Sequence, residues 1–246
     1  MPDHHHVEVR AYAQLQDLLG RTRVEVPIGE PRSVKDLVES VGLAHPEIGL
    51  LLVDGRPVRF DHRLHGGERV AAYPPLLSLE PRGSLWPRPP EPRRFVLDVH
   101  LGTLARRLRL LGFDSWYGTD TDDRRLAQVA TGEGRILLTR DRGLLMRREI
   151  VHGYGPRSDD PDEQIHEVAV RYSLATRARP LTRCPRCNGD LAPVPLAAVR
   201  DQVPPRTRRA FDRYARCVDC YQVYWPGSHL DALTERLGGL LGDPRR

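Results

Sequence analysis

The sequence has no long hydrophobic run. No apolar stretch in its 246 residues approaches the roughly 20 residues that a membrane-spanning helix needs. Residues 1–6 include three histidines and lack the apolar core of a signal peptide. We therefore expect a cytoplasmic chain that makes no use of a membrane.

Several catalytic signatures are also missing. The sequence has no glycine-rich phosphate loop, no H-E-x-x-H helix and no Ser-His-Asp arrangement. These absences argue against the nucleotide, metalloprotease and serine hydrolase chemistries that such motifs support. No internal repeat is present either.

Lysine is almost absent, because Lys35 is the single lysine among 38 basic residues. The net charge of +5 therefore rests on arginine, and residues 181–246 alone hold 11 basic and 7 acidic side chains. Arginine pairs well with phosphate. The same bias also fits a GC-rich coding sequence, so charge by itself is weak evidence for a nucleic-acid partner.

Cysteine is scarce and confined to the last third of the chain. Two C-x-x-C pairs, Cys184 with Cys187 and Cys217 with Cys220, are separated by 29 residues. Each pair places two thiolates on one turn, and two such turns form a tetrahedral zinc site with no open position. The alternatives are a thioredoxin-like dithiol or two disulfides, but two matched pairs in a reducing compartment favour structural Zn²⁺.

The N-terminal part predicts a small α+β domain. Alternating apolar and polar positions indicate half-buried strands, and Asp54-Gly55 indicates a hairpin turn. Ser33 is a suitable N-cap for a helix with one apolar face. The expected strands are residues 7–12, 24–26, 50–53, 57–58 and 69–73.

This order of elements resembles the β-grasp fold, and more narrowly the ThiS/MoaD-like sulfur carriers. Those carriers end in a free Gly-Gly whose carboxylate is activated. Here the last strand continues into Tyr73-Pro74-Pro75. We therefore expect a structural module, or one that binds a protein partner, without carrier chemistry.

Beyond a proline-rich linker, apolar runs alternate with helical patterns. This alternation, with short connections, predicts a parallel-sheet α/β domain. The expected strands are residues 95–97, 116–117, 136–140 and 150–151. The expected helices are residues 101–111, 123–130, 141–146 and 161–172.

Aspartates follow two of these strands and begin the helix between them. Asp98 and Asp141 end apolar runs, and Asp122 and Asp123 start a helix. Since the carboxyl ends of parallel strands share one edge of a sheet, the acids can form a Mg²⁺ or Mn²⁺ site. The alternative is that they only cap helices. The Thr139 hydroxyl can orient a carboxylate or a water.

Five segments form a distinctive combination: DVHLGTLARRLRLLGFD (98–114), DTDD (120–123), GRILLTRD (134–141), RCPRCNG (183–189) and YWPGSH (224–229). Together they resemble the Mut7-C domain, a branch of the PIN-like ribonucleases with an appended zinc ribbon. A ubiquitin-like or ThiS-like domain ahead of Mut7-C is also a known arrangement.

The sequence pattern and this resemblance together predict an α/β protein with five parts. They are a β-grasp domain (1–75), a linker (76–93), a PIN-like nuclease domain (94–180), a four-cysteine zinc ribbon (181–230) and a short amphipathic helical tail (231–246).

The resemblance also implies a ribonuclease site. Asp98, Asp123 and Asp141 would hold Mg²⁺ or Mn²⁺, with Asp122 as the next candidate. Hydrolysis of RNA phosphodiesters would then use a metal-activated water. The alternative is a catalytically inactive RNA-binding adaptor that uses the ribbon and the β-grasp domain. Candidate RNA contacts are Arg106, Arg109 and Arg140, with the ribbon residues Arg200, Arg206, Arg208, Arg209, Arg213 and Arg216.

Overall fold

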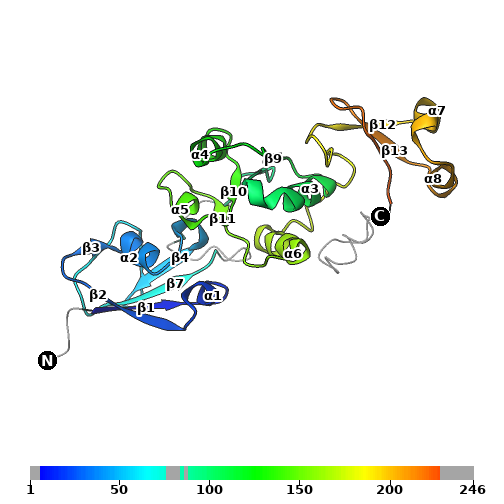
Figure 1. Ribbon diagram of the computed structural model, residues 1–246. Helices are drawn as coiled ribbons and strands as arrows, with labels where there is room; N and C mark the ends of the chain where they lie inside the picture. Colours follow the sequence, from blue (N-terminus) through cyan, green and yellow to red (C-terminus); the bar gives the residue numbers. More distant parts are fainter. Residues whose placement is uncertain (1–5, 76–83, 86–87, 228–246) are drawn as a thin grey trace. The chain divides into compact units, whose positions relative to one another are not determined.

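The computed structural model describes residues 6–75, 84–85 and 88–227 (Figure 1). The chain divides into two compact units. The first joins Met1–Pro89 with Asp141–Gly155, and the second joins Pro90–Arg140 with Pro156–Arg246. Predictions for the first five residues, for much of the linker and for the helical tail fall outside the described residues. Across the described ranges, no helix is long and apolar enough to span a bilayer.

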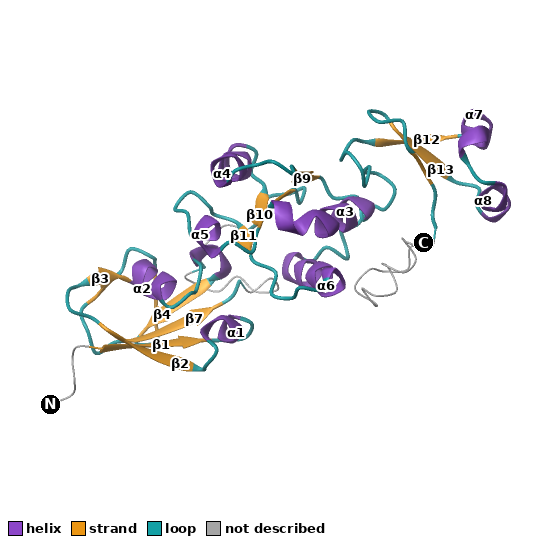
Figure 2. Cartoon of the chain, viewed as in Figure 1, coloured by secondary structure: helices purple, strands orange, loops and turns teal. Residues whose placement is uncertain are grey.

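A five-stranded sheet forms the framework of the first unit (Figure 2). Its strands are β1 (His6–Ala11), β2 (Arg23–Pro27), β4 (Leu50–Val53), β5 (Arg56–Val58) and β7 (Arg69–Tyr73). They are ordered β2-β1-β7-β4-β5, with β1 and β7 parallel and the other pairs antiparallel. This is the β-grasp arrangement expected from the sequence.

Helix α2 (Val34–Ser40) packs on this sheet. Ser33 caps the helix by accepting a hydrogen bond from the backbone N–H of Asp36, as its position before the apolar repeat predicts. The apolar face of α2 is buried with the inward side chains of the strands. This core includes Val34, Leu37 and Val38 from the helix and Val7, Val9, Leu51 and Val70 from the sheet.

The segment Asp141–Gly155 belongs to this unit and contains α5 (Arg142–Leu145) and β11 (Gly153–Tyr154). Its main attachment is Glu47, whose side chain is fully buried. The Glu47 carboxylate pairs with Arg142 Nη1 at 2.8 Å and accepts the Gly155 backbone N–H at 3.1 Å. A buried carboxylate is stable only when it is paired and hydrogen-bonded. These contacts therefore fix both ends of the segment on the β-grasp core.

The second unit contains three parallel strands in the order β10-β8-β9. They are β8 (Phe95–Leu97), β9 (Ser115–Tyr117) and β10 (Ile136–Leu138), connected by α3 (Gly102–Leu110) and α4 (Asp123–Gly132). The chain leaves β8 in one direction through α3 and returns past it through α4. Right-handed crossovers in opposite directions place the two helices on opposite faces of the strands. The predicted parallel α/β architecture is therefore confirmed.

The core on the α3 side is aromatic. Phe95 is fully buried and makes edge-to-face contacts with Phe113 at 6.0 Å and with Tyr172 of α6 (Pro161–Tyr172) at 5.9 Å. Helix α3 ends at Leu110, and Gly112, just after its C-cap, has a φ of +92°. A Cβ there would overlap the Arg179 carbonyl oxygen, so this close approach requires glycine.

The ribbon that follows contains an antiparallel sheet with the strand order β12-β13-β14. Its strands are β12 (Leu191–Val194), β13 (Tyr214–Cys217) and β14 (Val223–Tyr224), and the insert before β13 contains α7 (Leu196–Val199) and α8 (Pro205–Ala210). Its small core consists of the buried residues Val199, Val203, Tyr214 and Val223.

Several details differ from the sequence predictions, among them the helices α7 and α8, which were not expected. The strand expected at residues 150–151 is absent, because the Ile150 backbone N–H donates to the Arg147 carbonyl in a turn after α5. A two-residue strand forms at Gly153–Tyr154 instead. The short helix α1 (Leu15–Leu19) was not expected. Neither was the two-stranded pair β3 (Arg32–Ser33) and β6 (Arg63–Leu64).

Candidate functional site

The four cysteines converge in the second unit. Their sulfur atoms all lie within 4.8 Å of one another, with 3.6 Å between Cys184 and Cys220 and 3.4 Å between Cys187 and Cys217. All four are free of disulfides. A tetrahedral zinc with Zn–S bonds of about 2.3 Å separates its sulfurs by about 3.8 Å. Among the described residues this is the one set of three or more potential ligands gathered so closely, and it can hold zinc.

The two cysteine turns have matching backbone geometry. The residue after each second cysteine, Asn188 or Tyr221, adopts a left-handed conformation with a φ of +68° or +60°. Gly189 follows the first turn and faces the second one. A Cβ at Gly189 would overlap an Asp219 carboxylate oxygen and would lie 3.1 Å from Cys217 Sγ. Glycine at 189 therefore lets the two turns approach closely enough to share an ion.

The thiols have divergent acidities. Burial raises the pKa of Cys184, but hydrogen bonds from Tyr224 and from backbone N–H groups outweigh it and bring the pKa to about 7. Burial and the neighbouring thiols raise the pKa of Cys187 to about 12. One thiol ionises readily, while adjacent thiols resist a second negative charge. A divalent cation relieves this repulsion by binding all four as thiolates.

Arg109 connects the first cysteine turn to the α/β strands. Its side chain is 5% exposed, although the sequence suggested an RNA contact. The guanidinium donates from Nε to the Ser115 carbonyl at 2.9 Å, and from Nη1 to the carbonyls of Pro185 and Arg186 at 3.3 and 3.2 Å. Because its donors are engaged inside the protein, we do not include Arg109 among the proposed RNA contacts.

Asn188 makes a second connection beside Arg109. Its Oδ1 accepts the Ser115 backbone N–H at 2.9 Å, and its Nδ2 donates to Asp114 Oδ1 at 2.7 Å. Asp114 in turn receives a bidentate pair from Arg135 at 2.7 and 3.0 Å. The cysteine turn and the start of β9 are therefore joined by a continuous network of charged and amide hydrogen bonds.

This network predicts an acid-sensitive contribution to stability. Burial raises the pKa of Asp114, but the bonds from Arg135 and Asn188 outweigh it, so the net pKa lies below its ordinary 3.8. A lowered folded-state pKa stabilises the protein above the unfolded value, and this contribution is lost as pH falls through the folded value. Asp114→Asn should cost about 1–2 kcal/mol at pH 7, after allowance for partial exposure.

The check is urea unfolding of the wild type and of Asp114→Asn at pH 7 and near pH 3. The difference between the two proteins should shrink at the lower pH. Glu133→Gln is the matched control, since Glu133 also pairs with Arg135 but is 46% exposed. A pH-independent difference would mean that the Asp114 charge contributes nothing.

Asp98 occupies the carboxyl end of the middle strand, β8. Its side chain is 6% exposed and accepts three hydrogen bonds from within the unit. Asp98 Oδ2 accepts from Thr139 Oγ1 at 2.5 Å and from the Arg140 backbone N–H at 3.1 Å, while Oδ1 accepts from the His100 backbone N–H at 2.9 Å. The carboxylate is thus fixed in orientation, with Thr139 in the orienting role that its sequence position suggests.

The other predicted acids are exposed helix caps or first-turn residues. Asp122 caps α4 by accepting the Arg125 backbone N–H at 2.7 Å, and Asp123 is the first residue of that helix. Asp141 caps α5 by accepting the Leu144 backbone N–H at 3.1 Å. A carboxylate has about four lone-pair sites, so a capping role does not prevent it from also serving as an oxygen ligand.

The remaining candidate RNA contacts lie in different environments. Arg106 is exposed on α3. Arg140 is 40% exposed and forms an ion pair with Asp159, which is itself 88% exposed. An exposed pair of this kind is weak and exchanges easily. Both side chains are therefore accessible to an anionic ligand.

Sequence reasoning did not assign roles to Asp114, Arg135, Asn188, Gly189 and Tyr224. The Tyr224 hydroxyl lies 3.2 Å from Cys184 Sγ, within hydrogen-bonding distance. Asn188 and Gly189 directly follow a C-x-x-C pair, and this position in the sequence could have indicated that they shape the cysteine turn. Nothing in the sequence marks Asp114 and Arg135 as partners.

Comparison with known proteins agrees with this combination of an α/β sheet edge and a cysteine centre. The family model of the Mut7-C RNAse domain matches residues 93–237, and that of the Mut7-C ubiquitin domain matches residues 4–79. The chain therefore has an RNase-type domain behind a ubiquitin-like one. It belongs to the Mut7-C RNAse domain family, as the sequence motifs indicated.

Solved structures with similarity to this chain include two small archaeal proteins. One, described as subunit 1 of a molybdopterin converting factor from Pyrococcus furiosus, is 25% identical. The match covers 29% of this chain and 98% of the archaeal protein, with a TM-score of 0.26. Small archaeal modifier protein 1 of H. volcanii is 20% identical, with the same coverages and TM-score. No curated protein matches the chain.

Proposed function

We propose that this protein is a metal-dependent ribonuclease that hydrolyses RNA phosphodiesters. The observation that carries the proposal is the Asp98 carboxylate, held by Thr139 and by two backbone N–H groups at the carboxyl end of a parallel strand. Ligands and catalytic groups in open α/β sheets gather at this edge. Membership of the Mut7-C RNAse domain family supports RNA as the substrate.

In this proposal Asp98, Asp123 and Asp141 hold Mg²⁺ or Mn²⁺, with Asp122 as the next candidate. Their carboxylate oxygens match the ligands that these ions prefer. Asp141 directly follows Arg140, whose backbone N–H bonds Asp98, so chain continuity favours a shared role. When bound, the ion would supply charge stabilisation and an activated water.

The protein's own residues would bind and orient the RNA. Arg106 and Arg140 are exposed and can contact backbone phosphates. The ribbon would add affinity, since its insert presents arginines to solvent. Arg200, Arg206, Arg209 and Arg213 are exposed, and Arg208 and Arg216 are partly exposed.

The test is cleavage of labelled single-stranded and structured RNA by zinc-loaded protein, with Mg²⁺, with Mn²⁺ and with neither. Extensive dialysis is preferable to EDTA, which would also remove zinc. We expect cleavage that needs the added metal and disappears in Asp141→Asn. Cleavage that survives this substitution would point to another site or a contaminant. RNA binding without cleavage under any condition would favour the adaptor function.

A further inference from the structure

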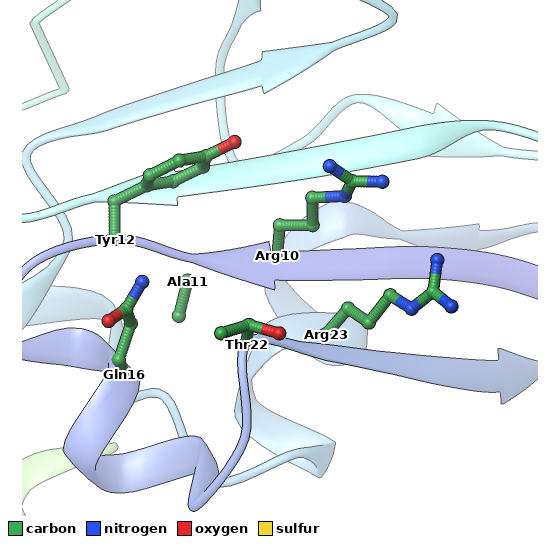
Figure 3. Close-up of a pocket in the computed structure, with 6 residues that line it drawn as sticks. All are labelled: Arg10, Ala11, Tyr12, Gln16, Thr22 and Arg23. Carbon is green, nitrogen blue, oxygen red and sulfur yellow. The ribbon is translucent and has the colours of Figure 1, made fainter.

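An open depression of about 550 Å³ lies on the first unit where β1 ends and β2 begins (Figure 3). Its volume falls within the range of small-ligand sites, roughly 300–1,000 Å³. The lining is polar and aromatic. The side chains that matter for binding are Arg10, Tyr12, Gln16, Thr22 and Arg23.

Two arginines provide the charge of this depression. Arg10 and Arg23 are cross-strand neighbours on β1 and β2, so their side chains share one face. Both pair with Glu8, at 2.7 Å for Arg10 and 3.4 Å for Arg23. Their side chains remain 44% and 63% exposed. Each guanidinium has five N–H donors, and one carboxylate cannot occupy them all. The depression therefore keeps donors and positive charge for an anion.

An aromatic surface adjoins the arginines. The ring of Tyr12 stacks on that of Tyr73, with centroids 4.4 Å apart and planes 7° apart. In Figure 3, Tyr12 and Arg10 project to the same side of the strand, while Ala11 projects to the other. Because Tyr12 also lines the depression, a flat ring entering there would extend the existing stack. Gln16 and Thr22 line the depression on the other side of the strand and add polar groups there.

We propose that this depression binds a short single-stranded RNA segment, with phosphates on Arg10 and Arg23 and a base stacked against Tyr12. Cationic groups beside an aromatic platform form the usual binding surface for single strands. An acidic peptide would use the arginines but would leave the stacked tyrosines without a role. The choice of RNA rests on the proposed function, and the ubiquitin-like unit would then contribute an RNA-binding surface of its own.

Glu8 has a specific place in this proposal. It pairs with both guanidiniums and offsets part of their charge in the absence of RNA, and phosphates compete with it for the same donors. Removing its charge should therefore strengthen RNA binding, whereas removing either arginine should weaken it. General electrostatic attraction would give the same signs, so a defined site is distinguished by the comparison with an arginine elsewhere in the unit and by the dependence on the Tyr12 ring.

The experiment uses the full-length zinc-loaded chain carrying Asp98→Asn, so that cleavage cannot consume the probe. The probe is fluorescein-labelled oligoadenylate of about eight nucleotides, a length within the site size of single-strand binding folds. Anisotropy titrations between about 50 and 200 mM salt give the affinity and the salt dependence of log K. Thermal unfolding of each variant checks that the fold is intact.

Arg10→Ala and Arg23→Ala should each weaken binding about threefold to tenfold and reduce the salt slope by about 0.7 per lost phosphate contact. Glu8→Gln should tighten binding about threefold. Tyr12→Leu should weaken it about tenfold, while Tyr12→Phe keeps the affinity because the ring is retained. Arg59→Ala, an exposed arginine elsewhere in the unit, is the matched control and should change nothing.

Equal losses in Arg10→Ala and Arg59→Ala would overturn the site, as would tighter RNA binding in Tyr12→Leu. Arginine-dependent binding of a labelled oligoglutamate, with RNA binding unchanged in every variant of the depression, would assign it to an acidic peptide instead.

Cleavage is measured separately on the chain with native Asp98. An inactive enzyme whose RNA binding depends on the depression would refute only the nuclease. An active enzyme whose RNA binding ignores these substitutions would refute only the depression as a binding site.

Discussion

Asp98→Asn is expected to reduce RNA cleavage at least 10³-fold while RNA affinity stays within about twofold. The electrostatic stabilisation by a bound metal is worth several kcal/mol, and each 1.36 kcal/mol is tenfold in rate. The substituted side chain would retain one carbonyl oxygen for the His100 N–H. Its amide NH₂ would not carry the negative charge that holds the metal. This NH₂ would also face the Arg140 backbone N–H, so that two donors would meet. Single-turnover cleavage and anisotropy on the same RNA measure the two effects.

A companion variant separates orientation from charge. Thr139→Val removes the hydroxyl that donates to Asp98 at 2.5 Å and leaves the carboxylate in place. Loss of a hydrogen bond that orients a metal ligand typically costs 10–100-fold in activity or metal affinity. Thr131→Val, on the surface of α4, is the matched control and should cleave normally. Asp98→Asn protein with undiminished cleavage would remove Asp98 from the active site.

Loss of zinc is expected to unfold the ribbon. Its core has four buried residues, too few to stabilise a small domain without a metal. Zinc binding to four-ligand sites contributes about 10–16 kcal/mol of apparent free energy at pH 7. Cys217→Ser removes a buried ligand at the end of β13, so the three-stranded ribbon sheet should lose its protection from hydrogen exchange.

The same change should reach the start of β9. The Ser115 N–H bonds Asn188, and Arg109 bonds two carbonyls of the first cysteine turn, so both lose partners when that turn unfolds. Metal analysis should give one zinc per wild-type chain and none bound tightly in Cys217→Ser. In Cys217→Ser, amide hydrogen exchange should become faster in the ribbon and at residues 113–116. It should stay unchanged in β1 and β4 of the first unit.

Arg186→Ala is the control for this experiment, because Arg186 lies exposed within the first cysteine turn and contributes only its backbone to the network. It should keep its zinc and its exchange pattern. A ribbon that stays protected without zinc, or a β9 that does not respond, would show that the metal and the network are uncoupled.

Much of the local structure follows from the sequence. Apolar runs bounded by glycine or by capping residues located β8, β10 and α2, because hydrophobic periodicity and caps act within a few residues. The paired C-x-x-C motifs located the two cysteine turns for the same reason. The aspartates after β8 and β10 were found because carboxyl ends of parallel strands collect polar groups.

Contacts between distant segments decided the rest. Arg109 lies on a helix whose pattern suggested a solvent-facing arginine, yet it is buried against carbonyls 76 and 77 residues away. Glu47 pairs with Arg142 across 95 positions and fixes the segment after Asp141 to the β-grasp core. Periodicity carries no information about such partners, because a buried charge is satisfied by whichever donors the folded chain brings to it.

The sequence by itself therefore determined the family, the β-grasp and parallel α/β folds, the two cysteine pairs and the aspartates at the strand ends. Tertiary structure alone decided which charged groups hold the protein together and which remain accessible. The physical reason is range: caps, turns and hydrophobic patterns act locally, whereas the pairing of buried charges depends on the complete fold.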